Sequence, residues 1–261
     1  WKSGTGGTPT AKRMAYGGTQ IWKEDLDGTW DSIKTGLESG KRASFTQYND
    51  VCIWSSTSPI DVPQTWNQTD AATSNLGGSP PNFAFCVPHR GRMWAAGVAS
   101  NPSRLYYSAL DNHADWTGAG SGSIDIDTND GDDITGLVSH KQRLWTLKGP
   151  NHGSIHYITG SAPTGADAFA RIPFVTGVPC VSHQSIVAYP DDIAFVSTRG
   201  VHSLKATEQF GDMKDGYLSF HLQHGNPAFF PDGLDLSAFP FVQGVNHSMR
   251  GVLLWTMRQA G

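Results

Sequence analysis

Apolar and polar positions along the chain follow a repeated plan. In "ITGLVSHKQRLWTLKGPNHGSIHYITG", residues 134–160, an apolar run, a polar turn, a second apolar run, a Gly-containing turn and a third short apolar run succeed one another. The same order occurs in "QSIVAYPDDIAFVSTRGVHSLKA" at 184–206 and in "NFAFCVPHRGRMWAAGVASNPSRLYYSAL" at 82–110. Short apolar runs bounded by turn residues are typical of β-strands. The pattern therefore predicts an all-β chain built from repeated hairpins.

Less regular copies of the plan lie at 13–33, 45–59 and 241–259. The residue after each first turn marks five repeats: Val51, Met93, Leu144, Ile193 and Val252, which lie 42, 51, 49 and 59 positions apart. These spacings bracket the roughly 40 to 50 residues of a β-propeller blade. A unit of this size must stack on its neighbours to bury its apolar face. We expect a β-propeller-like array of five or six degenerate blades, with an irregular β-sandwich as the alternative.

The whole chain, 1–261, is expected to form a single domain. Because it begins at Trp1 without a Met and stops after a strand-like run, we also expect a segment of a longer protein. Two long joins rich in Pro, Gly, Ser and Thr, 59–82 and 161–180, should lie on the surface, where partner contacts occur. The best helical candidate is 206–225, which overlaps an insertion or loop region expected at 207–240.

Charge and cysteine content exclude several classes of protein. The formal charge is −4 and only 16% of residues are charged, so the chain has no basic field to attract nucleic acid or an anionic membrane. No apolar run approaches the ~18 residues of a membrane span. Cys52, Cys86 and Cys180 lack metal-ligand spacing and are expected to be small buried hydrophobes, although one disulfide with a spare thiol stays open.

The stretch "GSIDIDTNDGDDITGL", 122–137, raises the question of a cation site. An EF-hand loop that starts at Asp125 would need Gly at the sixth position and Glu at the twelfth, but Asp130 and Gly136 stand there. Asn, Asp and Gly tolerate positive φ and cap their own backbone. We therefore interpret 129–131 as a tight turn, and leave open weak cation binding at 125–133.

Candidate catalytic groups are few. Propeller glycosidases use carboxylates at a central mouth, and the aspartates that would have to converge are Asp132, Asp133, Asp191, Asp192 and Asp212. Turn formation explains these aspartates without catalysis. The sequence also lacks GxSxG, Walker A, GxGxxG and HExxH motifs. We expect no enzyme, with no catalytic, cofactor-binding or metal-binding residue.

Two further residue types were candidates for binding. The histidine pairs His152 with His156, and His221 with His224, have spacings that would share a metal only on a helix, so solvated or hydrogen-bonded rings are expected. Three tryptophans follow strand-like runs and sit in polar turns: Trp30, Trp66 and Trp116. A bulky aromatic there can fill the gap between adjacent repeats, which we favour over stacking on a sugar ring.

The central part of the chain resembles a known family. The motifs that carry the resemblance are Arg104, Leu105, Tyr107, Ser108 and Ala109; Asp115 and Trp116; Ile124 to Ile126; Ile134 to Leu137; Arg143, Leu144 and Lys148; and Ser154 to Gly160. They are similar to the β-propeller region of tail nozzle or hub structural proteins of short-tailed, podovirus-like bacteriophages. The resemblance covers residues 13–206, and the acidic stretch matches the family's Gly/Asp turn.

The resemblance implies a non-enzymatic virion protein without a cofactor. Such a protein is part of a tail ring that continues the DNA exit channel and anchors fibres, and it is assembled in the host cytoplasm. The implied partners are copies of itself in a cyclic hexamer, a portal or adaptor protein, tail fibre or spike proteins, and DNA in passive contact. The alternative is a carbohydrate-binding or glycoside-cleaving receptor-binding propeller, suggested by tryptophans near Asp132 and Asp191.

Overall fold

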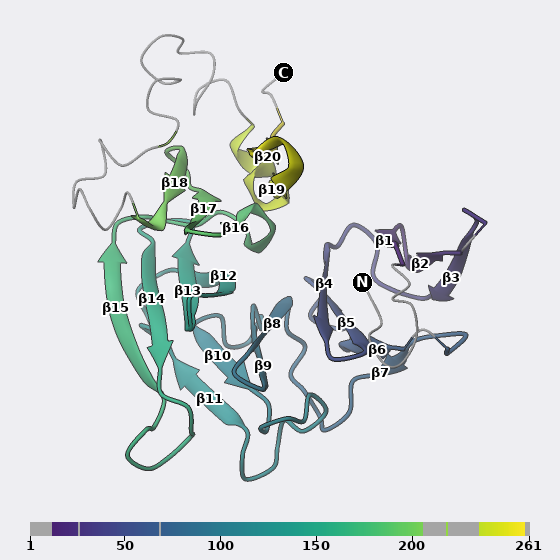
Figure 1. Cartoon of the computed structure of the whole chain (residues 1–261), viewed down its shortest axis with the longest axis horizontal. Helices are drawn as coiled ribbons and strands as arrows, with labels where there is room; N and C mark the ends of the chain where they lie inside the picture. The colour runs from purple at the N-terminus through teal and green to yellow at the C-terminus, as the bar shows by residue number, and fades with distance from the viewer. Residues whose placement is uncertain (1–11, 26, 68, 206–217, 219–234, 259–261) are drawn as a thin grey trace. The chain divides into compact units, whose positions relative to one another are not determined.

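The computed structural model describes residues 12–25, 27–67, 69–205, 218 and 235–258 (Figure 1). Most of the secondary structure in these residues consists of antiparallel β-sheets and three short 3-10 helices, η1 (His183–Ser185), η2 (Leu236–Phe241) and η3 (Ser248–Arg250). Leu204 and Lys205, directly after the last strand of the fifth sheet, are helical. No helix in this part of the chain is both long and apolar enough to cross a membrane. The chain comprises two compact units, Trp1–Asp125 and Ile126–Gly261.

The first unit holds three sheets whose strands follow one another in chain order. Their strands are β1 (Met14–Gly17), β2 (Gln20–Glu24) and β3 (Trp30–Lys34); β4 (Ala43–Tyr48), β5 (Val51–Ser56), β6 (Gln64–Trp66) and β7 (Ser74–Asn75); and β8 (Phe85–His89), β9 (Arg92–Ala96), β10 (Arg104–Tyr107) and β11 (Gly122–Asp125). Each sheet is thus a simple meander, as in a propeller blade.

The second unit repeats this arrangement. Its strands are β12 (Asp133–His140), β13 (Arg143–Gly149), β14 (Ser154–Thr159) and β15 (Ala170–Thr176); β16 (Val187–Tyr189), β17 (Asp192–Val196) and β18 (Val201–Ser203); and β19 (Gln243–His247) and β20 (Val252–Thr256). The described residues therefore form six small meander sheets in chain order, and not the two large sheets of a sandwich. The all-β, propeller-like expectation is confirmed.

The repeat markers lie where the hairpin pattern placed them. All five fall at the first or second residue of the second strand in their sheets, namely β5, β9, β13, β17 and β20. In the β12–β13 hairpin, Lys141 and Gln142 both have positive φ, at 47° and 64°. Two such residues match a type I′ connection, whose twist suits a tight hairpin. Local turn geometry thus fixes the register that the sequence pattern indicated.

The two long joins contain strands that the sequence pattern missed. The join 59–82 contributes β6 and the edge strand β7, and the join 161–180 contributes the edge strand β15, while β6 lies between β5 and β7. Edge strands tolerate Pro and lack strict alternation, and Pro173 in β15 is such a case. The sequence pattern therefore gave no indication of the strands within these two joins. The helical candidate 206–225 lies almost entirely outside the described residues.

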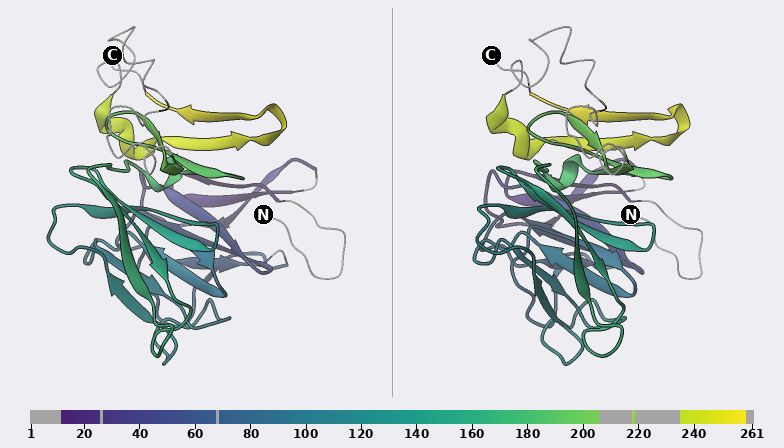
Figure 2. Two further views of the ribbon diagram at one scale, coloured as in Figure 1. Left: turned by 60° about the vertical axis from the view of Figure 1, so that its left-hand side comes forward. Right: turned by 90° about the vertical axis from the view of Figure 1, so that its left-hand side faces the viewer.

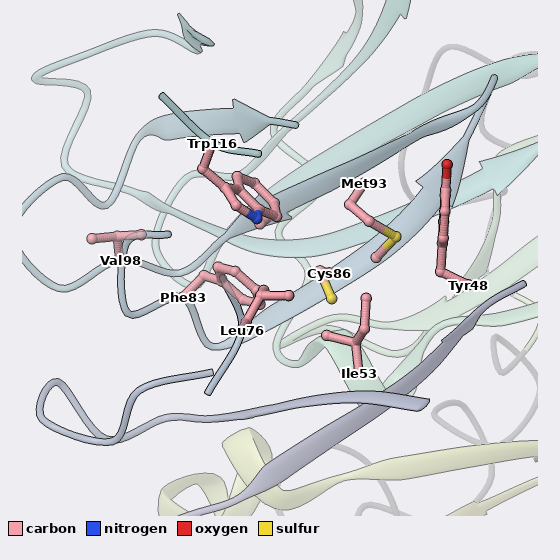
Figure 3. Close-up of a cluster of buried hydrophobic side chains, with 9 residues drawn as sticks. Tyr48, Ile53, Leu76, Phe83, Cys86, Met93, Val98 and Trp116 are labelled. Carbon is pink, nitrogen blue, oxygen red and sulfur yellow. The ribbon is translucent and has the colours of Figure 1, made fainter. Parts of the chain in front are cut away.

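Consecutive sheets in the first unit pack through separate apolar clusters. Figure 3 shows the cluster between the β4–β7 and β8–β11 sheets, where Ile53, Met93 and Trp116 face one another. A second cluster, which includes Ile21, Trp54 and Trp66, joins the β1–β3 sheet to the β4–β7 sheet. Both clusters draw side chains from two sheets, so the described faces of these sheets depend on a neighbouring sheet for burial.

The same packing continues in the second unit. Trp145, Ile155 and Phe195 belong to the cluster between the β12–β15 and β16–β18 sheets. A smaller cluster with Val196 and Val242 joins the β16–β18 sheet to the segment of η2 and the β19–β20 hairpin, which lie beside it in Figure 2. Sheet faces are thus buried in series along the chain, which is how blades pack.

This close packing predicts a steep cost for a single methyl group at Gly153. Its φ is +73°, and a Cβ there would collide with the backbone of Pro179. Gly165 is the matched control, because its φ is +93° but nothing surrounds the missing Cβ. We expect Gly165→Ala to lower the free energy of unfolding by about 1 kcal/mol, and Gly153→Ala by at least about 2 kcal/mol more. Urea unfolding measures both, and equal losses would contradict the packing described above.

Candidate functional site

The acidic turn between β11 and β12 encloses a cation that the chain itself supplies. Lys148 of β13 has a side chain with 0% exposure. Its ammonium donates hydrogen bonds to the carbonyls of Ile126 at 2.8 Å and Asp127 at 2.6 Å, and to the Asp130 carboxylate at 2.7 Å. An ammonium has three donors, and all three are used. The turn therefore holds Lys148 at its centre.

The backbone of this segment confirms the turn interpretation. Asp127, Asn129 and Gly131 all have positive φ, at 41°, 67° and 82°. The Asp127 carboxylate accepts a hydrogen bond from Arg171 and lies 3.2 Å from Nε2 of His156. Carboxylates here are therefore paired with cationic or imidazole groups from β13, β14 and β15, which ties the turn to its sheet.

Asp132 is the most deeply buried carboxylate of the stretch, with 4% exposure. It accepts hydrogen bonds from the backbone N–H groups of Asn151 at 2.7 Å, His152 at 2.9 Å and Gly153 at 2.7 Å. Burial opposes ionisation, but these three donors outweigh it and lower the pKa of Asp132 below its ordinary value. This carboxylate shapes the β13–β14 turn, while neighbouring Asp133 is exposed at the start of β12.

Asp192 has a comparable structural role at the start of β17. Its carboxylate accepts hydrogen bonds from the backbone N–H groups of Ile193 at 2.7 Å and Lys205 at 3.0 Å, and from the hydroxyls of Tyr189 at 3.0 Å and Ser203. Asp191 is exposed in the adjacent turn. Asp212, the fifth catalytic candidate, lies outside the described residues. Both buried carboxylates thus have structural partners: Asp132 binds the β13–β14 turn, and Asp192 binds residues of β16, β17 and the end of β18.

The histidine pair of the second unit does not form a shared site. His152 is exposed, whereas His156 is buried and its Nε2 lies 2.9 Å from the Ser154 hydroxyl. No group of three or more His, Cys, Asp or Glu side chains in the described part of the chain has metal-binding geometry. His221 and His224 fall outside that part.

Two of the three candidate tryptophans fill space between sheets. Trp66 is 1% exposed and donates its indole N–H to the Asp70 carbonyl; Trp116 is 8% exposed and donates to the His113 carbonyl. The packing interpretation is confirmed for both, since buried rings present no face to a sugar. The expected position in a turn was wrong for two of the three tryptophans, because Trp30 begins β3 and Trp66 ends β6. Trp30 is also exposed.

The three cysteines are free and buried, as expected. Burial raises the pKa of the Cys52 thiol to about 12 and that of Cys180 to about 11, and it also raises the pKa of Cys86. Their thiolates are therefore scarce at neutral pH, and these residues behave as small hydrophobes. The open alternative of one disulfide with a spare thiol is excluded.

A pocket of about 400 Å³ lies in the second unit between the turn of the β12–β13 hairpin and the turn of the β16–β17 hairpin. Its walls include charged and aromatic side chains: His140, Arg143, Trp145, Phe174, Asp191 and Lys205. Arg143 and Trp145 alternate along β13 and so project from the same face of the strand. The first hairpin turns of two adjacent sheets thus form opposite sides of the pocket.

The Arg143 guanidinium is held by aromatic stacking. It lies 4.5 Å from the ring centroid of Tyr157 and 5.7 Å from that of Trp145. Within the described ranges its nitrogens have no hydrogen-bond or ion-pair partner. Burial and the charge of Lys141 lower the pKa of His140 against the opposing effect of Asp192 and Asp191, so that this ring is neutral near pH 7.

Sequence reasoning missed this pocket. Arg143 was noticed only within a motif, and Trp145, Phe174 and Lys205 were not singled out. The lining residues come from β12, β13, β15, β17, two hairpin turns and the segment after β18, and no local spacing connects them. One signal was available: the alternation of Arg143 and Trp145 directly after a predicted turn places a cation and an aromatic ring on one face of a strand.

The acidic turn yields a prediction about Lys148. Lys148→Met would leave two carbonyls and the Asp130 carboxylate without their cation. We expect the free energy of unfolding to fall by about 3 kcal/mol, because removal of one partner leaves buried polar groups unpaired. Lys41→Met is the control, since Lys41 makes a partly exposed pair with Glu38 and should cost less than about 1 kcal/mol. Similar losses in the two variants would exclude this role for Lys148.

Buried imidazoles predict the pH dependence of stability. His183 accepts a hydrogen bond at Nδ1 from the Leu137 backbone N–H, and burial lowers its pKa from 6.5 to about 4; His89 and His202 are lowered likewise. Between pH 6.5 and 4 the unfolded chain therefore binds more protons than the folded protein, and the free energy of unfolding must decrease as the pH falls.

The variant His183→Asn retains an acceptor near the position of Nδ1 without a titrating ring. We expect it to reduce the slope of unfolding free energy against pH by up to about 1.4 kcal/mol per pH unit in this window. Chemical unfolding at several pH values between 4 and 7 measures the slope. An unchanged slope would show that His183 is protonated equally in both states.

Comparisons with known proteins assign no family to this chain. No protein-family model matches the sequence, and no curated protein matches it. Among solved structures, the chain is similar to the crystal structure of the N-terminal domain of Nup159, with a TM-score of 0.46 and 8% identity over 95% of this chain and 70% of that chain. A likeness at this level carries no functional argument.

Proposed function

We propose that the chain is a non-enzymatic structural protein of a bacteriophage tail, of the nozzle or hub type. The observation that carries the proposal is that the residues of the tail-protein motifs are scaffold residues in this fold. Arg104 of β10 pairs with Asp125 of β11, with its Nε 2.6 Å from the carboxylate. The Ser108 hydroxyl accepts a hydrogen bond from the backbone N–H of Met93 at 3.0 Å. These contacts join neighbouring strands within one sheet.

The Asp-Trp motif has an equally structural basis. The Asp115 carboxylate accepts a hydrogen bond from the backbone N–H of Gly118 at 2.8 Å, and a Cβ at Gly118 would collide with that carboxylate. Trp116 then enters the cluster between two sheets. In the next motif a Cβ at Gly136 would collide with Ile186. The motif spacing thus encodes turns and close sheet contacts, which supports a scaffold protein.

The charge distribution supports passive contact with DNA. With a net charge of −4 the chain offers DNA few cationic partners, and a neutral or acidic channel lets DNA slide because phosphates are not held. The proposal includes a location in the virion tail after assembly in the host cytoplasm. It also includes a cyclic hexamer that contacts a portal or adaptor protein and fibre or spike proteins.

An exposed apolar sheet face supports contact between copies. Val245 of β19 pairs with Leu254 of β20, and the two side chains are 56% and 51% exposed; Val252 on the same face is 40% exposed. In the four described apolar clusters, by contrast, apolar side chains of the sheets are buried against a neighbouring sheet or segment. A heterologous interface between copies would extend the same packing, and repetition of such an interface closes a ring.

Electron microscopy of the native particle tests the proposal. Gold-labelled antibodies raised against the chain should mark the end of the tail, and averaged images should show a ring coaxial with it. Label on the head or at the tail periphery would contradict the nozzle assignment.

A substitution tests the apolar face. Leu254→Lys places a charge on the exposed face of β20 and should shift the purified chain from ring-sized to monomer-sized species in light scattering. Leu110→Lys is the control, because Leu110 is 55% exposed and belongs to the first unit and not to this hairpin. If both variants assemble like the wild type, the β19–β20 face is not the contact between copies.

A further inference from the structure

We propose that the pocket between the β12–β13 and β16–β17 turns binds an acidic sugar residue, whose carboxylate pairs with Arg143. The pocket lies within the second unit and is formed by described residues of that unit. The proposal does not depend on assignment to a phage tail. It concerns a site that is separate from the acidic turn around Lys148.

Arg143 is a pre-positioned anion receptor. Its guanidinium is stacked on the rings of Tyr157 and Trp145, which limits its motion. None of its donors is engaged by another described residue. A planar guanidinium presents parallel donors that match the two oxygens of a carboxylate. The ammonium of Lys205, at the same pocket and also without a described partner, adds a second positive charge.

Trp145 offers a donor inside the pocket wall. The residue is 7% exposed, and its indole N–H is buried with no hydrogen-bond acceptor among the described residues. A buried donor without an acceptor is unfavourable. Because this N–H has almost no accessible surface in the free protein, a sugar oxygen reaches it when the ring shifts on binding, and the new hydrogen bond then adds affinity. Nε2 of His140 is likewise buried and has no hydrogen-bond partner among the described residues. These two groups indicate a ligand that carries several oxygens and not a purely apolar one.

Asp191 and Phe174 narrow the ligand class. Asp191 is exposed at the pocket, and its carboxylate is an acceptor that suits hydroxyl groups but repels a second negative charge. Phe174, packed edge-on against Trp145 with centroids 5.0 Å apart, provides an apolar wall. A phosphate has no hydroxyl-rich or apolar face to meet these groups. An acidic sugar has a carboxylate, hydroxyls and a C–H face together.

The volume fits one or two sugar rings. Pockets for small ligands begin at about 300 Å³, and this one has about 400 Å³. Because Lys141, Arg143 and Asp191 at its rim are exposed, the sugar can be one residue of a longer polysaccharide that enters from solvent. The structure therefore assigns the pocket to acidic polysaccharides such as those that contain uronic or sialic acids.

Saturation-transfer NMR and calorimetry with the full chain test the site. The probes are glucuronic acid and N-acetylneuraminic acid, with glucose, benzoate and inorganic phosphate as comparisons. We expect saturable binding of at least one acidic sugar, and binding at least about tenfold weaker for glucose and for the variant Arg143→Gln, since a bidentate charged pair is lost. Arg250→Gln, an exposed substitution in the same unit, should bind like the wild type.

The comparisons separate the alternatives. Equal binding of phosphate would reduce the pocket to a general anion site and overturn the sugar assignment, and equal binding of benzoate would do the same in favour of small aromatic acids. Absence of binding by both acidic sugars overturns it as well. Trp145→Phe, with its fold checked by circular dichroism, should weaken sugar binding by removing the indole N–H, and unchanged affinity would exclude that contact.

Discussion

Burial of apolar sheet faces is the constraint on which the rest of this structure depends. A meander of two to four short strands has two faces and no interior, so it gains stability only when another sheet covers it. Here each covered face has its own cluster, with Trp66 and Trp116 in two of them. The chain therefore stabilises sheets in series, and loss of one interface weakens the sheets on both sides of it.

Stacking of sheets also explains where buried charge occurs. When neighbouring sheets pack closely, the turns that join their strands are drawn into the edges of the packed faces, and their polar groups need partners. In the acidic turn, the carbonyls of Ile126 and Asp127 would otherwise lack hydrogen-bond donors. The buried ammonium of Lys148 supplies these donors. Asp132 and Asp192 supply acceptors for backbone N–H groups in the same way. Aspartates in this fold are accordingly structural elements of turns.

Much of the fold could be predicted from the sequence, because hairpin turns leave a local record. The markers from Val51 to Val252 fall at the start of second strands, since a polar turn between apolar runs is a short-range signal. The edge strands β7 and β15 have a weaker sequence pattern, because edge strands carry few apolar residues. The partner of the acidic turn could not be predicted: Lys148 lies 18 positions from Asp130, and only the β12–β13 register brings them together.

The pocket shows why function is harder to predict than fold in a repeated architecture. Repeats conserve the strands and turns that stack, so a periodic pattern reports the scaffold and is silent about what differs between copies. Arg143 occupies a position in β13 where an ordinary strand would carry any polar residue, and its meaning depends on Tyr157 beneath it and on Lys205 from another sheet. Binding sites on such scaffolds are formed by individual residues that differ from one repeat to the next. These residues are identified by their proximity in the three-dimensional structure.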